Sequence, residues 1–141
     1  MHEYFVELRI CGKDLDPAII TDGLGLVPTT VRKVGDIVGT KRFEQATWGY
    51  NGSESDTPPT WKSLEEGLSF VLDKLDPVRP KLEEYKKSYK MIWWCGHFHS
   101  GFDGGPTLSP SMLKRLGDFG VPLFVDTYLS EESSAIEAVH Q

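Results

Sequence analysis

Cys95, His97 and His99 are the residues whose types and spacing come closest to a chemical site. Residues two apart on an extended strand point to the same side, so these three side chains would share one face. Thiolate and imidazole groups are common zinc ligands, and Asp103 or Glu7 would have to supply a fourth ligand. A strand rises by about 3.3 Å per residue, however, which puts Cys95 about 13 Å from His99 and too far away to ligate the same ion. We therefore expect no metal and no other cofactor, and we keep a small-molecule-binding or metal-binding regulatory domain that uses Cys95, His97 and His99 as the alternative function.

Two further motifs could support catalysis. Cys95 could act as a nucleophile with His97 or His99 as its base, but no helix N-terminus follows it to lower the pKa of the thiol. The segment 101–106, Gly-Phe-Asp-Gly-Gly-Pro, precedes a helix start as phosphate-binding loops do. It lacks the lysine and the glycine spacing of such loops, so it indicates a tight turn. We expect that the protein is not an enzyme.

A larger group of side chains would share one face of a sheet. Alternation along three expected strands places together aromatic and charged residues, namely Glu7, Arg9, Trp93, His97, Asp126 and Tyr128. An exposed face that carries aromatic residues among charges is typical of a recognition surface. We interpret these six residues as a partner-binding site. The alternative is that the helical segment 60–88 covers this face and makes it a second core.

The elements that must position these residues are visible in the sequence. The stretch Lys90–Leu129 predicts a strand, a helix and a second strand. Ser109 is a suitable N-cap before Pro110, and Gly120 supplies the left-handed residue that ends the helix. Further predicted elements are a strand over 3–11, a helix that opens at Asp16-Pro17, a short strand that ends at residue 50, a helix over 60–76 and a short helix over 79–87.

The composition limits the class of protein and of partner. With 15 basic and 21 acidic side chains among 141 residues, the net charge is −6, which argues against nucleic acid as a partner because such binding neutralises phosphates. An acidic protein would suit a basic protein partner. No apolar run approaches the roughly 20 residues that span a bilayer, so we expect no membrane contact and a cytoplasmic location. Two cysteines, each within a predicted strand, indicate reduced thiols rather than a disulfide framework.

These patterns predict an α+β fold. We expect a four-stranded, mainly antiparallel sheet built from two split βαβ halves, a ferredoxin-like arrangement with a helical insertion between the halves. Residues 1–130 would form a single domain, and residues 131–141 a polar and flexible C-terminal tail.

The segment 108–116, Leu-Ser-Pro-Ser-Met-Leu-Lys-Arg-Leu, followed by Val-Asp-Thr-Tyr at 125–128, resembles the domain of unknown function 4279 family, a mostly bacterial group of small single domains. The segments 8–12, 14–17, 28–36 and 75–77 fit the same pattern, so the resemblance covers most of residues 3–129. It implies no established activity. By analogy with small domains of this sort that serve as immunity proteins beside bacterial toxins, we expect a non-enzymatic binding domain, of the immunity type in its narrower form.

Overall fold

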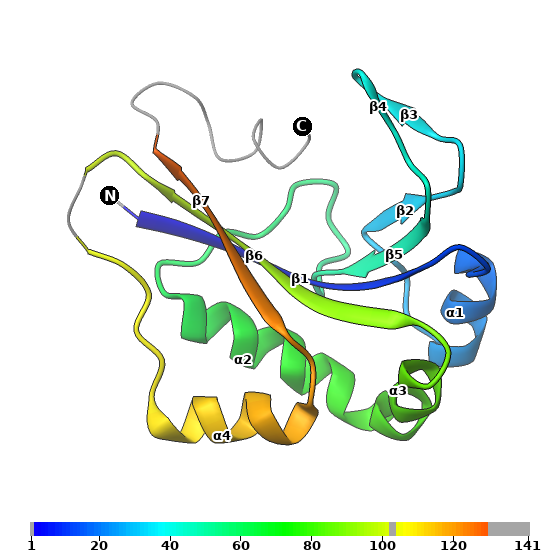
Figure 1. Cartoon of the computed structure of the whole chain (residues 1–141). Helices are drawn as coiled ribbons and strands as arrows, with labels where there is room; N and C mark the ends of the chain where they lie inside the picture. Colours follow the sequence, from blue (N-terminus) through cyan, green and yellow to red (C-terminus); the bar gives the residue numbers. More distant parts are fainter. Residues whose placement is uncertain (1, 102–103, 130–141) are drawn as a thin grey trace.

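A five-stranded sheet is the frame of the molecule. In a computed structural model, which describes residues 2–101 and 104–129, the strand order is β2-β5-β1-β6-β7 (Figure 1). The strands are β1 (His2–Gly12), β2 (Thr30–Arg32), β5 (Ala46–Tyr50), β6 (Lys90–His99) and β7 (Leu123–Leu129). Only β6 and β7 pair in parallel, whereas the other neighbours are antiparallel. Two short strands, β3 (Ile37–Val38) and β4 (Lys41–Arg42), form a separate hairpin that projects from the sheet.

The predicted α+β class is confirmed, but the four-stranded ferredoxin-like arrangement is wrong. The segment 28–46 supplies the edge strand β2 and the β3–β4 hairpin. The chain from β1 through the first helix also returns as an antiparallel neighbour, β5, and not as a parallel strand. Of the two expected βαβ halves, only the second, from β6 to β7, therefore has the parallel pairing that defines the unit.

Four α-helices and one 3-10 turn lie within the described residues. They are α1 (Pro17–Leu24), α2 (Leu64–Leu75), the 3-10 turn η1 (Asp76–Val78), α3 (Arg79–Lys86) and α4 (Pro110–Phe119). The Asp16 side chain accepts a hydrogen bond from Ala18 N, and Ser109 Oγ accepts one from Met112 N at 3.2 Å. Gly25 and Gly120 end α1 and α4 at φ values of 67° and 74°, in the left-handed region that glycine tolerates.

The helix expected over 60–76 begins later than predicted. Ser63 caps it by accepting a hydrogen bond from Glu66 N, so the first helical residue is Leu64. Trp61 instead exchanges two backbone hydrogen bonds with Tyr4, at 2.8 and 2.9 Å. The residues before α2 are therefore joined to β1 by an isolated β-bridge, which no local sequence pattern predicts.

All of these helices lie on the same side of the sheet (Figure 1), and the main core fills the space between. Leu68 of α2, Leu8 of β1, and Trp48 and Trp93 of the neighbouring strands are fully buried there. Gly67 lets α2 approach closely, because a Cβ at this position would lie 2.7 Å from Val6 Cγ2 and from Trp61 Cδ1. The opposite face of the sheet has no helix from the described part of the chain.

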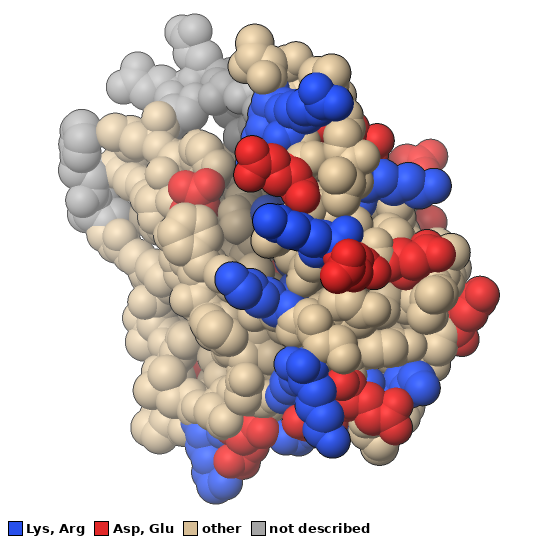
Figure 2. Space-filling model, turned by 45° about the vertical axis from the view of Figure 1, so that its right-hand side comes forward, with Lys and Arg blue, Asp and Glu red and all other residues tan. Residues whose placement is uncertain are grey.

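Charged side chains of both signs lie on the side of the molecule that Figure 2 presents. Figure 2 shows basic and acidic side chains intermixed on the side that it presents, without a large area of one sign. No helix within residues 2–101 and 104–129 has the length and apolar character needed to cross a membrane. The polar tail predicted over 131–141 lies outside the described residues.

Candidate functional site

The register between β1 and β6 decides which side chains reach the face without helices. Leu8 lies opposite Trp93, and Glu7 lies opposite Trp94. Directly opposed residues of antiparallel strands point to the same face, so Trp93 joins the core beside Leu8 and Trp94 joins Glu7. We call the face opposite the helices the helix-free face. Its central residues are Phe5, Glu7 and Arg9 of β1, Ile92, Trp94 and Phe98 of β6, and Phe124, Asp126 and Tyr128 of β7.

The structure confirms the predicted placement of Glu7, Arg9, Asp126 and Tyr128 on one face, but the placement of Trp93 and His97 beside them is wrong. Trp93 is 0% exposed and His97 is 3% exposed, both on the helix side. The aromatic residues that take their place are Trp94 and Phe98.

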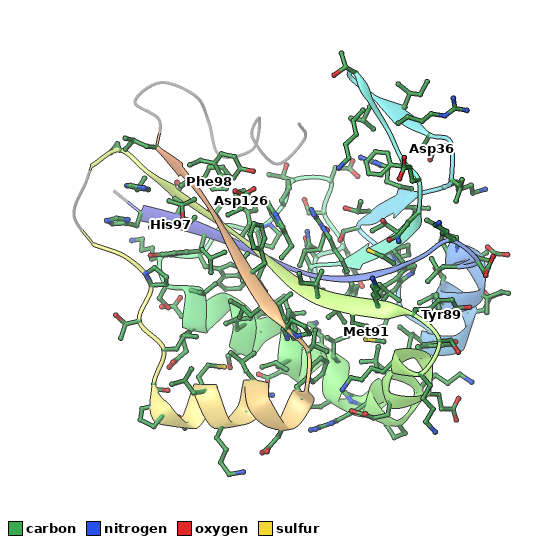
Figure 3. The ribbon with its side chains drawn as sticks, in the orientation of Figure 1. Asp36, Tyr89, Met91, His97, Phe98 and Asp126 are labelled. Atoms are coloured by element: carbon green, nitrogen blue, oxygen red, sulfur yellow. The ribbon has the colours of Figure 1, made fainter. Side chains whose placement is uncertain are left out.

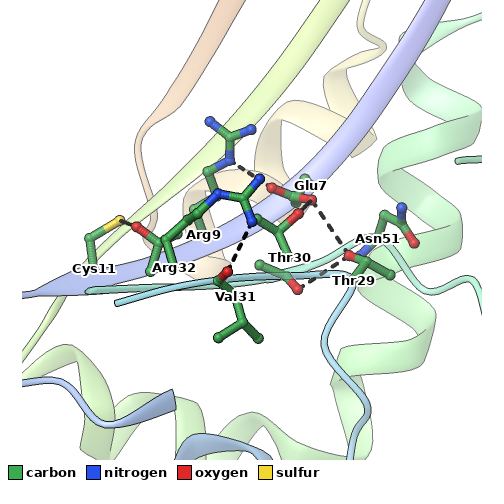
Figure 4. A network of polar contacts seen from close by, with 10 residues as sticks. Glu7, Arg9, Cys11, Thr29, Thr30, Val31, Arg32 and Asn51 are labelled. Carbon is green, nitrogen blue, oxygen red and sulfur yellow. Dashed lines mark hydrogen bonds and ion pairs between the residues drawn. The ribbon is translucent and has the colours of Figure 1, made fainter. Parts of the chain in front are cut away.

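The acidic centre of the helix-free face is the carboxylate of Glu7 (Figure 4). It accepts hydrogen bonds from Arg9 Nε at 2.6 Å and from Thr30 Oγ1 at 2.9 Å. It lies over Gly49 of β5, where a Cβ would approach Glu7 Oε1 to 2.7 Å. Because Glu7 is only 8% exposed, these partners are what make its burial tolerable.

Arg9 links this carboxylate to the aromatic part of the face. Its guanidinium carbon lies 4.5 Å from the centre of the Trp94 ring, within the range of a cation–π contact. Its Nε is engaged by Glu7, but within the described part of the chain neither terminal nitrogen has a hydrogen-bond partner. Arg9 is therefore positioned by Glu7 and Trp94 and retains two donors that fit a carboxylate.

Four aromatic rings form a small second cluster on the same face. Phe5 meets Phe98 edge to face at 5.3 Å between ring centres, and Phe98 stacks on Tyr128 at 4.8 Å. Phe5 and Phe98 are buried, whereas Trp94 and Tyr128 remain partly exposed around them. The cluster thus offers two half-exposed rings that are fixed by two buried ones.

Tyr128 and Asp126 form a polar pair beside these rings. The Tyr128 hydroxyl donates a hydrogen bond to the Asp126 carboxylate. Burial, and then the hydrogen bond and the negative charge of Asp126, raise the pKa of Tyr128 to about 12. The phenol therefore stays protonated and acts as a hydrogen-bond donor at neutral pH, not as a base.

Three histidines cluster on the opposite, helix-side face, at the end of the sheet where β1 begins. His2 Nδ1 lies 2.8 Å from His97 Nε2, and the ring centres of His97 and His99 are 4.7 Å apart. Figure 3 shows His97 at this end of β6. The rings stack nearly parallel, at 16° to 26° between planes, so their nitrogens do not converge on one point. Nothing in the sequence pattern singled out His2, because its partners are 95 residues away.

Among the described residues, Cys95, His97 and His99 are not arranged as a set of metal ligands, and Asp103, which was considered as a further ligand, lies outside those residues. Within residues 2–101 and 104–129, no group of three His, Cys, Asp or Glu side chains could hold a metal ion. Cys95 is 0% exposed, and burial raises the pKa of its thiol to about 12. It therefore remains a neutral thiol in the core, which suits neither ligation nor nucleophilic attack.

Two surface hollows are lined by none of the central residues of the helix-free face. One, of about 410 Å³, lies between α2 and α4, and its cation, Arg115, is already paired with Asp73 at 2.7 Å and with Asp76 at 3.0 Å. The other, of about 360 Å³, lies where β1 and β6 meet the end of α3 and is lined mostly by lysines and turn residues. Among the described residues that line the first hollow, no side-chain hydrogen bond joins a serine to a glutamate, so no nucleophile–base pair is assembled there.

Comparisons with known proteins bear on the family. The sequence profile of the family described as Domain of unknown function (DUF4279) matches residues 2–130. Comparison with curated proteins and with solved structures gave no match. Since the profile spans nearly the whole chain, from β1 to the residue after β7, the protein belongs to the domain of unknown function 4279 family.

Proposed function

We propose that this protein is a non-enzymatic binding domain that engages a protein partner through its helix-free face. The observation that carries the proposal is the contiguous arrangement of Trp94, Tyr128 and Arg9. Two half-exposed aromatic rings lie beside a guanidinium whose terminal donors have no partner within the described residues. Interfaces take most of their binding energy from such residues, since Trp, Tyr and Arg are the commonest anchors.

The charges of the face suggest how the partner is recognised. Glu7 is already satisfied by Arg9 and Thr30, so it positions Arg9 and is not itself open to a partner. Arg9 would donate two hydrogen bonds to a carboxylate of the partner in a bidentate contact. The net charge of −6 acts at longer range and would speed the approach of a partner that is basic as a whole.

The narrower proposal is that the partner is a bacterial toxin and that the protein is of the immunity type. An acidic domain that binds a basic toxin and blocks it needs an anchoring surface but no catalytic group. The packed aromatic cluster would be such a surface. The wider proposal does not depend on this identity.

Capture from the native host tests the proposal. The full chain serves as bait, and Trp94→Ala and Tyr128→Ala serve as variants whose fold is checked by circular dichroism. Loss of a central anchor should weaken binding of the captured protein by about 30-fold or more. Leu113→Ala is the matched control, because Leu113 is 55% exposed on α4, on the other side of the sheet.

Three outcomes of this experiment would decide between the proposals. Both folded variants binding like the wild type would show that the face is wrong. If the captured protein is a toxin, co-expression of the wild type but not of Trp94→Ala should restore growth of cells that produce it. If the captured protein is not toxic, the proposal of a binding domain would stand and the proposal of an immunity role would be refuted.

A further inference from the structure

Strand β7 is an edge strand with one side unpaired. It pairs in parallel with β6 and has no neighbour beyond it in the described part of the chain. Its seven residues make it much longer than the other edge, β2, which has three. A long edge strand presents a row of backbone donors and acceptors to which another strand can pair.

The hydrogen-bond pattern shows which backbone groups point outward. Trp93 N donates to Pro122 O at 2.8 Å, so the backbone of Pro122 faces β6. The N–H and C=O groups of one strand residue point to the same side, and those of the next residue point to the opposite side. The backbone groups of the even-numbered residues therefore point toward β6, and those of Leu123, Val125, Thr127 and Leu129 point toward the open edge. Within residues 2–101 and 104–129, the outward amides of Val125 and Thr127 have no hydrogen-bond partner.

The side chains of β7 leave the edge open to pairing with another strand, and they could also select which strand pairs there. Proteins commonly protect an edge with lysines, with an internal proline or with a bulge, and the sequence Leu-Phe-Val-Asp-Thr-Tyr-Leu has no lysine and no proline. Phe124 is 48% exposed on the helix-free face. Asp126 lies on the same face at the middle of the strand, so a residue of an added strand would lie directly opposite it.

We propose that the protein partner adds a β-strand to the outer edge of β7, with a lysine or arginine opposite Asp126 and an apolar residue opposite Phe124. This inference rests on the proposed function and specifies how the partner is held at the edge of the helix-free face. Backbone hydrogen bonds supply affinity, while the side chain opposite Asp126 supplies selectivity. Two copies of β7 paired antiparallel over their whole length would put Asp126 opposite Asp126, and like charges in that position are destabilising.

A display library of random peptides of about twelve residues, selected against the full chain, is the probe. The enriched peptides should alternate apolar residues with a lysine or arginine, and they should slow amide hydrogen exchange at Val125 and Thr127. Thr127→Pro removes one outward N–H and leaves the ladder to β6 intact. It should weaken these peptides by about tenfold, since lost backbone hydrogen bonds and a displaced strand cost upwards of about 1.4 kcal/mol.

Matched variants distinguish binding at the outer edge of β7 from binding on the helix-free face. Thr127→Val retains the N–H and should bind like the wild type, whereas Asp126→Asn should weaken lysine-bearing peptides about two- to fivefold. The inference is overturned if no peptide is enriched, if enriched peptides bind Thr127→Pro as tightly as the wild type, or if the chain dimerises through β7. For the native partner, loss of binding in Trp94→Ala but not in folded Thr127→Pro would overturn strand addition alone, and retention in both would overturn the proposed function as well.

Discussion

His97 places an ionisable ring in a setting that favours its neutral form. It is 3% exposed, stacks on Tyr4 at 4.6 Å between ring centres and lies within hydrogen-bond distance of His2. Burial lowers the pKa of His97, and the charges of His99 and His2 lower it further. Protonation of His97 is therefore less favourable in the folded chain than in the unfolded chain.

Acid should destabilise the protein through His97. The unfolded chain protonates this ring at a pKa of about 6.5, above the folded value, so it binds more protons than the folded chain. The free energy of unfolding should thus fall as the pH drops below about 6.5 and through the folded pKa. Denaturant melts at about pH 7.5 and pH 5 measure this, and His97→Gln should lose less stability between them than the wild type.

His99→Gln is the control for this experiment. Burial is the largest cause of the lowered pKa of His97, and that cause survives the loss of His99. This variant should retain most of the pH dependence. Equal acid sensitivity in the wild type and His97→Gln would contradict the assignment to His97.

At the scale of elements, two helical glycines have opposite roles. Gly67 in α2 lies against β1, where a Cβ would come within 2.7 Å of Val6 and Trp61. A Cβ at Gly117 in α4 would meet no atom within 4 Å apart from its chain neighbours and the backbone of its own helix. The first glycine sets the distance between a helix and the sheet, whereas the second only weakens its helix.

Alanine at these two positions should therefore shift stability in opposite directions. Gly67→Ala should lower the free energy of unfolding by about 1–3 kcal/mol, because overpacking outweighs the gain in helix propensity. Gly117→Ala should raise it by about 0.5–1 kcal/mol. Chemical denaturation of both variants measures the difference, and stabilisation by Gly67→Ala would show that α2 can shift away from the sheet.

The sequence predicted those elements whose signals are local. The Ser109-Pro110 start and the Gly120 end of α4 are read from neighbouring residues, and the structure has them as expected. The face of β6 was not predictable in this way, because Met-Ile-Trp-Trp-Cys is apolar at every position and so has no alternation to fix its phase. Its phase is set by pairing with β1, which lies about 90 residues earlier in the chain. The errors at Trp93 and His97 both follow from this single shift by one residue.

At the scale of the whole molecule, the helices all cover one face and leave the other to smaller contacts. The main core lies under the helices, while the second cluster consists of Phe5 and Phe98 with Trp94 and Tyr128 packed around them (Figure 1). Among the described residues, two partly exposed rings thus lie beside Arg9 on the sheet, and the outer edge of β7 is unpaired. This division assigns stability to one side of the sheet and, in our proposal, recognition to the other.

Hydroxyl-radical footprinting of the captured complex tests the central claim most directly. Trp94 and Tyr128 are partly exposed on the helix-free face, and Trp61 and Tyr85 are partly exposed beside the helices, so the four rings report on the two sides within one sample. Binding through the helix-free face should reduce oxidation of Trp94 and Tyr128 and leave Trp61 and Tyr85 unchanged. Protection of Trp61 and Tyr85 with unchanged oxidation of Trp94 and Tyr128 would place the partner on the helices and contradict the account.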